Sequence, residues 1–163
     1  MPIRVTIRTI TRVPPESIAE GILDSAQWAS FKGWGPMPGI RSAAFTDRPD
    51  GVVGSRIAVT NTDGSTHTET ITGWDPPRSL SLRLDGFSRP LDRLATHFTE
   101  AWAFEPDPDP DGPRWTITRR FELHPAGVLG AVALRLVAPM LAAAVRRHMR
   151  VIEREQAESM QTR

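Results

Sequence analysis

The stretch Phe98-Thr-Glu-Ala-Trp-Ala-Phe104 (FTEAWAF) carries a charge in the middle of an apolar pattern. Alternate residues of a β-strand point to the same face of a sheet, so Phe98, Trp102 and Phe104 should lie together. Glu100 falls on that same face. A carboxylate among three aromatic side chains needs a partner, because a buried charge without one is costly.

The predicted strand 114–123 carries a matching interruption, because Arg119 breaks its apolar face. The other residues of that face are Trp115, Ile117, Phe121 and Leu123. If the acidic, proline-rich segment between the two strands closes an antiparallel hairpin with Phe104 opposite Trp115, Glu100 lies directly opposite Arg119. The β-carbons of opposed residues are about 4.5 to 5.5 Å apart. The sequence therefore predicts a buried Glu100–Arg119 pair within reach of a bidentate contact.

Turn-forming residues divide most of the chain into short strands. The predicted strands are 3–12, 40–46, 55–61, 66–74, 79–86, 96–105 and 114–123. No segment among them has the pattern of a crossover helix, so the sheet should be antiparallel. Two short helices are predicted within 15–31, and the glycine- and proline-rich loop 32–40 follows with Trp34. Segment 105–113 is interpreted as a solvated hairpin tip.

The last third of the chain is rich in Ala, Leu, Arg and Glu, which predicts one long helix from Val128 to about Ser159. Its second half is amphipathic. The protein side should carry Val145, Met149 and Ile152, and the water side should carry Arg146, Arg147, Arg150 and Arg154. Anionic membrane contact is the second interpretation of those arginines.

The first half of this helix, residues 128–145, is apolar apart from Gly130, Arg135 and Pro139. Eighteen residues is the lower limit for a membrane span, but an arginine inside a membrane helix costs roughly 2.5 to 3.5 kcal/mol. A buried or pocket-lining helix is the preferred interpretation. Glycine and alanine leave little volume against the sheet, so the helix either leaves a void or approaches the sheet closely. The alanines are Ala131, Ala133, Ala138, Ala142, Ala143 and Ala144.

Composition excludes several classes of protein. The 163 residues suit one domain, residues 1–163, and the net charge of +1 gives no reason to expect nucleic acid. Without cysteine there is no disulfide or thiolate chemistry, and the amino terminus lacks a signal-peptide pattern, so a cytoplasmic protein is expected. Nineteen arginines against one lysine hint at a bacterial origin. The chain contains no G-x-S-x-G, P-loop or dinucleotide-binding motif.

Two segments carry a family resemblance: HTETITGWDPPRSLSL at 67–82, and TEAWAFEP with GPRWTITRRFEL at 99–123. With the order of elements, they resemble the polyketide cyclase/dehydrase and lipid-transport proteins of the START-like (Bet v 1-like, SRPBCC) superfamily. The resemblance implies an α+β helix-grip fold, in which a seven-stranded curved antiparallel sheet wraps the carboxy-terminal helix and leaves an apolar cavity. Members of that superfamily bind hydrophobic ligands, and some cyclise polyketide chains. It implies no fixed catalytic set.

The candidate ligand-binding residues are Trp34, Glu69, Leu82, Phe98, Glu100, Trp102, Arg119, Leu136 and Met140. Trp34, with Trp28 and Phe31, would lie near the pocket mouth in the resembling family, or would cap the core. Glu69 and His67 face the cavity only if Thr66, Thr68 and Thr70 face outward, and the sequence leaves this parity open. No catalytic residue, metal or cofactor is predicted, because the histidines lack metal-ligand spacing.

The Glu100–Arg119 pair allows two interpretations. In the first, the pair has no role in binding: it is purely structural, or the register slips and both side chains reach water. In the second, the pair is the polar anchor of an apolar pocket, and Arg119 orients a ligand carboxylate or carbonyl. General-base chemistry at Glu100 is disfavoured, because a guanidinium nearby lowers the proton affinity of a carboxylate.

Three functions follow from this sequence. The first is a carrier or sensor that binds a small hydrophobic or aromatic molecule, as a monomer or homodimer. The second is a polyketide cyclase, aromatase or dehydratase-like enzyme. The third is a module whose apolar helix half docks on a membrane or a partner, although membrane contact is the less favoured expectation.

Overall fold

The computed structural model describes residues 1–161, with only the backbone described at 156, 157 and 159–161. Seven strands form one antiparallel sheet in the order β1-β7-β6-β5-β4-β3-β2. The strands are β1 (Ile3–Thr11), β2 (Ile40–Asp47), β3 (Arg56–Asn61), β4 (Thr66–Asp75), β5 (Ser79–Asp85), β6 (Ala95–Pro106) and β7 (Trp115–Pro125). The predicted antiparallel sheet, with short helices after the first strand and a long helix at the end, is confirmed.

Apart from a short one at 91–93, the helices lie where their sequence signals place them. They are α1 (Pro15–Leu23), η1 (Ser25–Ser30), η2 (Leu91–Arg93) and α2 (Gly127–Gln161). Proline occupies the first turn of α1, where its missing N–H costs nothing. The side chain of Asp24 accepts a hydrogen bond from Ala26 N and so caps η1. The short helix η2 was not predicted from the sequence.

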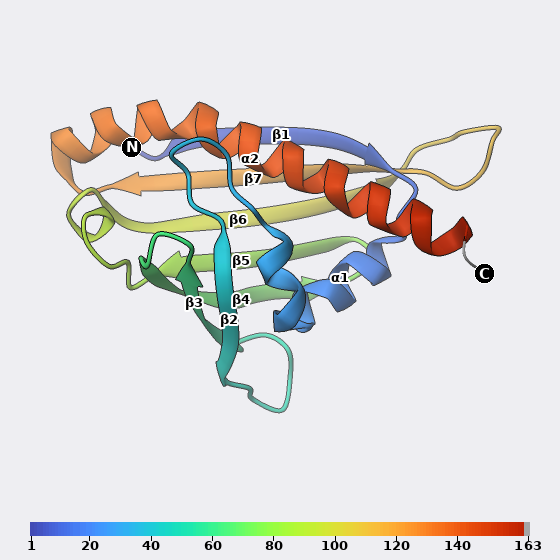
Figure 1. Cartoon of the computed structure of the whole chain (residues 1–163), viewed down its shortest axis with the longest axis horizontal. Helices are drawn as coiled ribbons and strands as arrows, with labels where there is room; N and C mark the ends of the chain where they lie inside the picture. The colour runs from blue at the N-terminus through green and yellow to red at the C-terminus, as the bar shows by residue number, and fades with distance from the viewer. Residues whose placement is uncertain (162–163) are drawn as a thin grey trace.

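Helix α2 runs along the β1 and β7 edge of the sheet (Figure 1). Its large buried side chains include Leu134, Val145 and Met149, which pack against the sheet. A β-carbon added at Gly130 would collide with the backbone carbonyl of Leu94, so the glycine permits a close approach. Of the two alternatives for the small residues of this helix, close approach is what the structure shows at Gly130.

Two apolar clusters fill the space inside the curved sheet. One joins α1, β3, β4, β5 and the second half of α2, and its members include Ile57, Ile71 and Met149. The other joins β1, β7 and the first half of α2, and its members include Leu134 and Phe121. Both halves of the chain therefore contribute to the interior that the sheet and α2 enclose.

The predicted register of the last hairpin is wrong by two residues. Trp115 pairs with Pro106, not with Phe104, and the tip begins after Pro106. Arg114 belongs to the tip because its guanidinium forms ion pairs there, with Asp107 and Asp109. A shift of two residues conserves parity, so the inward and outward faces of both strands are as predicted.

Candidate functional site

Glu100 and Arg119 form a buried pair on the concave face of the sheet. Arg119 Nε donates to Glu100 Oε1 over 2.7 Å. Glu100 is 6% exposed and Arg119 is 8% exposed. In the register of the structure Arg119 lies opposite Trp102, while Glu100 lies opposite Phe121. The pair is therefore diagonal, and the arginine reaches along the hairpin to the carboxylate. The predicted pairing of these two residues is present, although the predicted direct opposition is wrong.

Aromatic and thioether groups surround the guanidinium of Arg119. Its central carbon lies 3.9 Å from the ring centroid of Trp102, a cation–π contact, and 5.4 Å from that of Phe121. Its Nη1 also contacts Met149 Sδ of α2 at 3.9 Å. These neighbours fill the space around the charge, so a molecule that reaches Arg119 has to displace a side chain such as Met149.

The pair separates the two apolar clusters on both strands of the hairpin. On β6, Phe98 packs with the cluster of β1 and β7, Trp102 belongs to the cluster around α1, and Glu100 lies between them. On β7, Arg119 lies in the same way between Ile117 and Phe121. A polar band thus crosses an otherwise apolar wall.

Burial raises the pKa of Glu100 above its usual value. The guanidinium of Arg119 opposes that shift, and the nearby carboxylate of Glu69 adds to it. The guanidinium acts in the expected direction, but the loss of hydration outweighs the attraction between the charges. Glu100 can take up a proton more readily than an exposed glutamate.

The parity of β4, open at the sequence level, is settled by the structure. Glu69 and Ile71 are buried, whereas Thr66 is exposed, so the odd-numbered residues from His67 to Ile71 face inward; a bulge follows Ile71. His67 Nε2 lies 3.1 Å from Glu69 Oε1. A histidine and a second carboxylate on β4 therefore share the inward face with the polar band, with Leu82 and Leu84 of β5 between them.

Two buried nitrogen atoms in this interior lack a hydrogen bond among the described residues: Trp102 Nε1 and His148 Nδ1. The indole N–H is near enough to Glu100 to favour its ionised form, but its geometry is not that of a hydrogen bond. Buried polar atoms usually have partners, so a free indole N–H beside a buried ion pair points to a group that the chain does not supply.

His148 is a site residue that the sequence analysis missed. Its ring makes an edge contact with Phe31, with centroids 5.3 Å apart, where the loop after η1 meets α2. Burial, with a smaller contribution from Arg119, lowers the pKa of His148 to about 4. The helical spacing with Val145 and Ile152 could have identified it as an inward residue.

The remaining candidate residues lie in different surroundings. Leu82 is buried in the interior, and Met140 is partly buried on α2. Leu136, by contrast, is 66% exposed on the side of α2 that faces away from the sheet. Its inclusion was wrong, because the helix buries only the arc around Leu134. Trp34 is largely exposed at a tight turn in which its backbone N–H and carbonyl pair with Met37.

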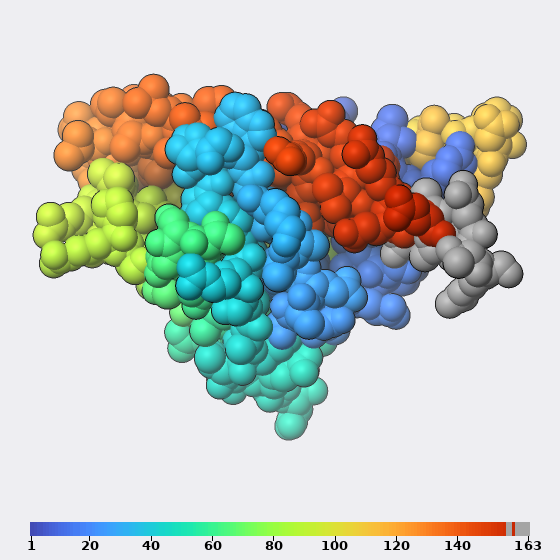
Figure 2. Space-filling view, in the orientation of Figure 1, coloured from blue at the N-terminus to red at the C-terminus, as the bar shows by residue number. Residues whose placement is uncertain are grey.

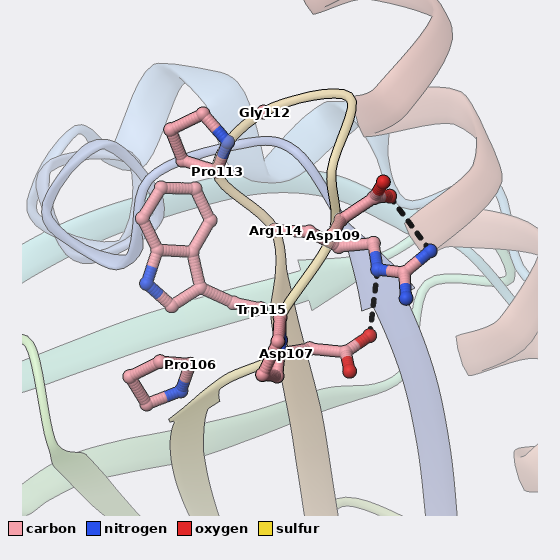
Figure 3. Close-up of a pocket in the computed structure, with 8 residues that line it drawn as sticks. Pro106, Asp107, Asp109, Gly112, Pro113, Arg114 and Trp115 are labelled. Atoms are coloured by element: carbon pink, nitrogen blue, oxygen red, sulfur yellow. Dashed lines mark ion pairs between the residues drawn. The ribbon is translucent and has the colours of Figure 1, made fainter.

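Two hollows in the described part of the structure lie outside the polar band. One, of about 310 Å³, is at the β6–β7 hairpin tip, where Trp115 lies between Pro106 and Pro113 (Figure 3). The other, of about 300 Å³, opens on the outer face of the sheet beside Ser81 and Arg120. Neither is the cavity between sheet and helix that the family resemblance implies.

Within the described part of the chain, no group of three or more histidine, aspartate or glutamate side chains is arranged to hold a metal ion. His97 and His124 stack with ring centroids 4.0 Å apart, and His124 approaches Glu122 at 3.7 Å.

The side chains of the polar band carry acid–base and hydrogen-bonding groups. Their chemistry is that of recognising a carboxyl, carbonyl or hydroxyl group in an apolar setting.

A curved antiparallel sheet closed by a long carboxy-terminal helix is the helix-grip fold of the Bet v 1-like class. The chain belongs to the family described as polyketide cyclase / dehydrase and lipid transport, whose model matches residues 2–156. A comparison with curated proteins finds no match.

Two solved structures share the fold at low sequence identity. The structure titled Ara h 8.0201 is 12% identical, with a TM-score of 0.57, and the alignment covers 91% of this chain and 99% of that one. The protein XoxI from Bacillus cereus is 14% identical, with a TM-score of 0.61, over 91% of this chain and 94% of that one. At these identities the likeness concerns the fold alone.

Proposed function

We propose that this protein binds a small, mainly hydrophobic molecule bearing one carboxyl or carbonyl group, and acts as a carrier or sensor of it. The ligand would lie between the concave face of the sheet and α2. The observation that carries this proposal is the polar band: a buried Glu100–Arg119 pair between two apolar clusters, with the unpartnered N–H of Trp102 beside it.

The raised pKa of Glu100 supplies a way to release Arg119. When Glu100 is protonated, it no longer neutralises the guanidinium, and a ligand carboxylate can take its place. Buried charges have to be paired, so a ligand carboxylate would restore to Arg119 the counter-charge that protonation of Glu100 removes. The indole N–H of Trp102 can then donate to the second oxygen of the ligand.

For a ligand to reach this position, side chains between the sheet and α2 have to move. Met149 contacts Arg119 directly, and the edge contact of Phe31 with His148 closes the space between the loop after η1 and α2. Methionine is unbranched and adapts its shape readily, so its displacement is the least costly of these movements. The ligand would thus enter between that loop and the helix.

Binding of two matched probes tests the proposal. Calorimetric titration of 2-naphthoic acid should give an affinity about tenfold or more lower in Arg119→Leu than in the unmodified protein. Binding of 2-ethylnaphthalene, a hydrocarbon of similar size, should change little. Arg120→Leu, at the neighbouring exposed position, is the control and should bind both probes normally.

Because Arg119→Leu leaves Glu100 buried without its partner, the double variant Glu100→Leu/Arg119→Leu should be titrated as well. It should keep the hydrocarbon affinity and lack the preference for the acid. Equal affinities for the acid in the double variant and the unmodified protein would remove Arg119 as the anchor.

A second candidate function is a cyclase or dehydratase-like enzyme, favoured by the His67–Glu69 contact and by Glu100 with its raised pKa. One group could remove a proton next to a carbonyl while another protonates the departing hydroxyl, releasing water. Loss of water from a β-hydroxy ketone probe, abolished by Glu100→Gln without loss of binding, would support this function over simple carriage.

A further inference from the structure

The side of α2 that faces away from the sheet is apolar in its first half. Val128, Leu129, Val132 and Leu136 are 83%, 75%, 51% and 66% exposed. Successive positions on a helix rotate by about 100 degrees, so these four share one side of the helix with Arg135 and Pro139. We call this set the α2 outer face. A group of large apolar side chains on one exposed helix surface marks an interaction site more often than chance exposure does.

Packing against the sheet does not account for the hydrophobicity of this helix. Segment Gly127–Glu155 is long and apolar enough to cross a membrane, yet only 28% of the residues in its most apolar stretch are buried. The inward arc, with Leu134 and Val145, satisfies the core. The outer face is therefore apolar in addition to what folding requires, and the burial of the inward arc is incompatible with spanning a bilayer in this fold.

Charge along the helix has one sign as far as Ile152, and Glu153 follows at the next position. Residues 126–152 contain no aspartate or glutamate, although they include Arg135, Arg146, Arg147 and Arg150. All four arginines are exposed, and helical spacing places the last three on the side of the outer face, beyond its apolar part. The complementary partner is a surface that offers both apolar depth and negative charge.

A loop beside α2 carries an exposed aromatic side chain. The loop 32–39 lies against the middle of α2 in the space-filling view (Figure 2), and Phe31 packs with the cluster that contains Leu134. Trp34 at its turn is 46% exposed. Tryptophan is enriched where apolar and aqueous phases meet, because its ring is apolar and its N–H is polar.

We propose that the α2 outer face docks on a membrane surface that contains anionic lipid. The helix would lie flat, with Val128, Leu129, Val132 and Leu136 among the outermost acyl carbons and the arginines at the phosphates. Arg135 within the apolar part can extend its charge to the headgroups along its aliphatic stem. Interfacial helices combine these two contributions, apolar burial and attraction to anionic headgroups.

Self-association explains the same face less well. A second copy would bring more arginines and, from residues 126–152, no carboxylate to neutralise them. An interface of that kind leaves like charges facing one another or buried without a partner. An anionic lipid surface neutralises all four arginines without requiring any further group from the protein. This inference stands independently of the proposed ligand.

Sedimentation with vesicles tests the proposal directly. The full chain should bind vesicles of phosphatidylcholine with phosphatidylglycerol, bind pure phosphatidylcholine vesicles at least about tenfold more weakly, and lose the difference as salt is raised. Val132→Asp should reduce binding to the anionic vesicles about tenfold or more, because burying an aspartate in the acyl region is unfavourable.

The matched control is Val53→Asp, at a valine that is also 51% exposed but lies in the loop between β2 and β3. It should bind vesicles normally. For charge, Arg146→Gln/Arg147→Gln/Arg150→Gln should lose the preference for anionic lipid. The equivalent triple change on the outer face of the sheet removes the same net charge and should keep that preference; its positions are Arg8, Arg56 and Arg120.

Any of the following results would overturn the proposal. The first is that the unmodified protein binds neither kind of vesicle. The second is an equal loss in Val132→Asp and Val53→Asp, or binding indifferent to lipid charge and salt. The third is a dimer in solution that Val132→Asp converts to a monomer without any vesicle binding, which would assign the face to a second copy. Circular dichroism of each variant establishes that it is folded.

Discussion

Two ion clusters lie on the β6–β7 hairpin in contrasting surroundings. At the tip, Arg114 pairs with Asp107 at 2.6 Å and with Asp109 at 2.8 Å, and Arg12 reaches Asp109 at 2.9 Å. The other cluster is the Glu100–Arg119 pair inside the sheet. Both join oppositely charged groups over similar distances, but the tip is nearer the surface: the side chain of Arg114 is 32% exposed and that of Arg119 is 9% exposed.

The carboxyl groups of the two clusters respond in opposite directions. The pKa of Asp109 is lowered, first by the backbone N–H of Asp111 and then by Arg114 and Arg12. The pKa of Glu100 is raised, because burial outweighs the attraction of Arg119. The tip cluster, near the surface, thus stabilises the end of the hairpin. The interior pair has an unfavourable desolvation energy, which a further polar group could reduce.

Removal of one interior charge should have the largest effect. Glu100→Ala leaves Arg119 buried without a counter-charge and should lower the free energy of unfolding by about 3 to 5 kcal/mol. Urea unfolding followed by circular dichroism measures this. Replacing both residues by leucine should recover much of the loss, and a double variant as unstable as the single one would show that the pair itself is stabilising.

The interior should also give the protein a stability that depends on pH. In the unfolded chain His148 takes up a proton near pH 6.5, whereas in the folded protein its pKa is about 4. The folded state therefore loses stability as pH falls from 6.5 to 4, by up to about 3 kcal/mol. His148→Leu should remove this part of the decline. Unfolding of both proteins at each pH gives the difference, and two parallel curves would contradict the account.

At the hairpin tip the effect should be small. Arg114→Gln breaks the contacts to Asp107 and Asp109, but Asp109 keeps Arg12 and the backbone N–H of Asp111 as partners and Asp107 is 25% exposed, so Tm should fall by less than about 3 °C. Differential scanning calorimetry measures the shift. A decrease as large as that of Glu100→Ala would mean that these remaining partners do not compensate for the loss of Arg114.

The smallest of the four effects should be the different salt dependence of Tm for variants of the two clusters. The Tm difference between Arg114→Gln and the unmodified protein should vanish near 1 M sodium chloride, where the screening length is about 3 Å. The difference for Glu100→Ala should persist, because ions do not enter the interior. Equal salt sensitivity of the two variants would indicate that Glu100 is hydrated.

The alternating pattern predicted the inward faces of β1, β6 and β7 correctly. It identified Glu100 and Arg119 as partners because both interrupt such a pattern. Register escaped the prediction, since a shift of two residues leaves every face unchanged and the contacts that fix the tip, such as the ion pairs of Arg114, do not appear in the pattern. For β4 the parity of Glu69 depended on the turn before it, which the sequence left open.

Helix α2 shows a different limit. Its apolar first half indicates a buried or pocket-lining helix, whereas the sheet covers only the arc around Leu134 and leaves Leu136 in solvent. Composition states how apolar a helix is and does not state how much of it the rest of the chain can cover. His148 was missed for a related reason, because its environment is made by Phe31, a residue distant in the sequence.

Native mass spectrometry of the freshly purified full chain tests most directly whether the interior beside Arg119 holds a ligand. The account predicts an adduct of a small apolar compound with an acidic or carbonyl group, present in the unmodified protein and in Arg120→Leu and depleted in Glu100→Leu/Arg119→Leu. Bare protein from every preparation, or the same adduct in the double variant, would contradict it.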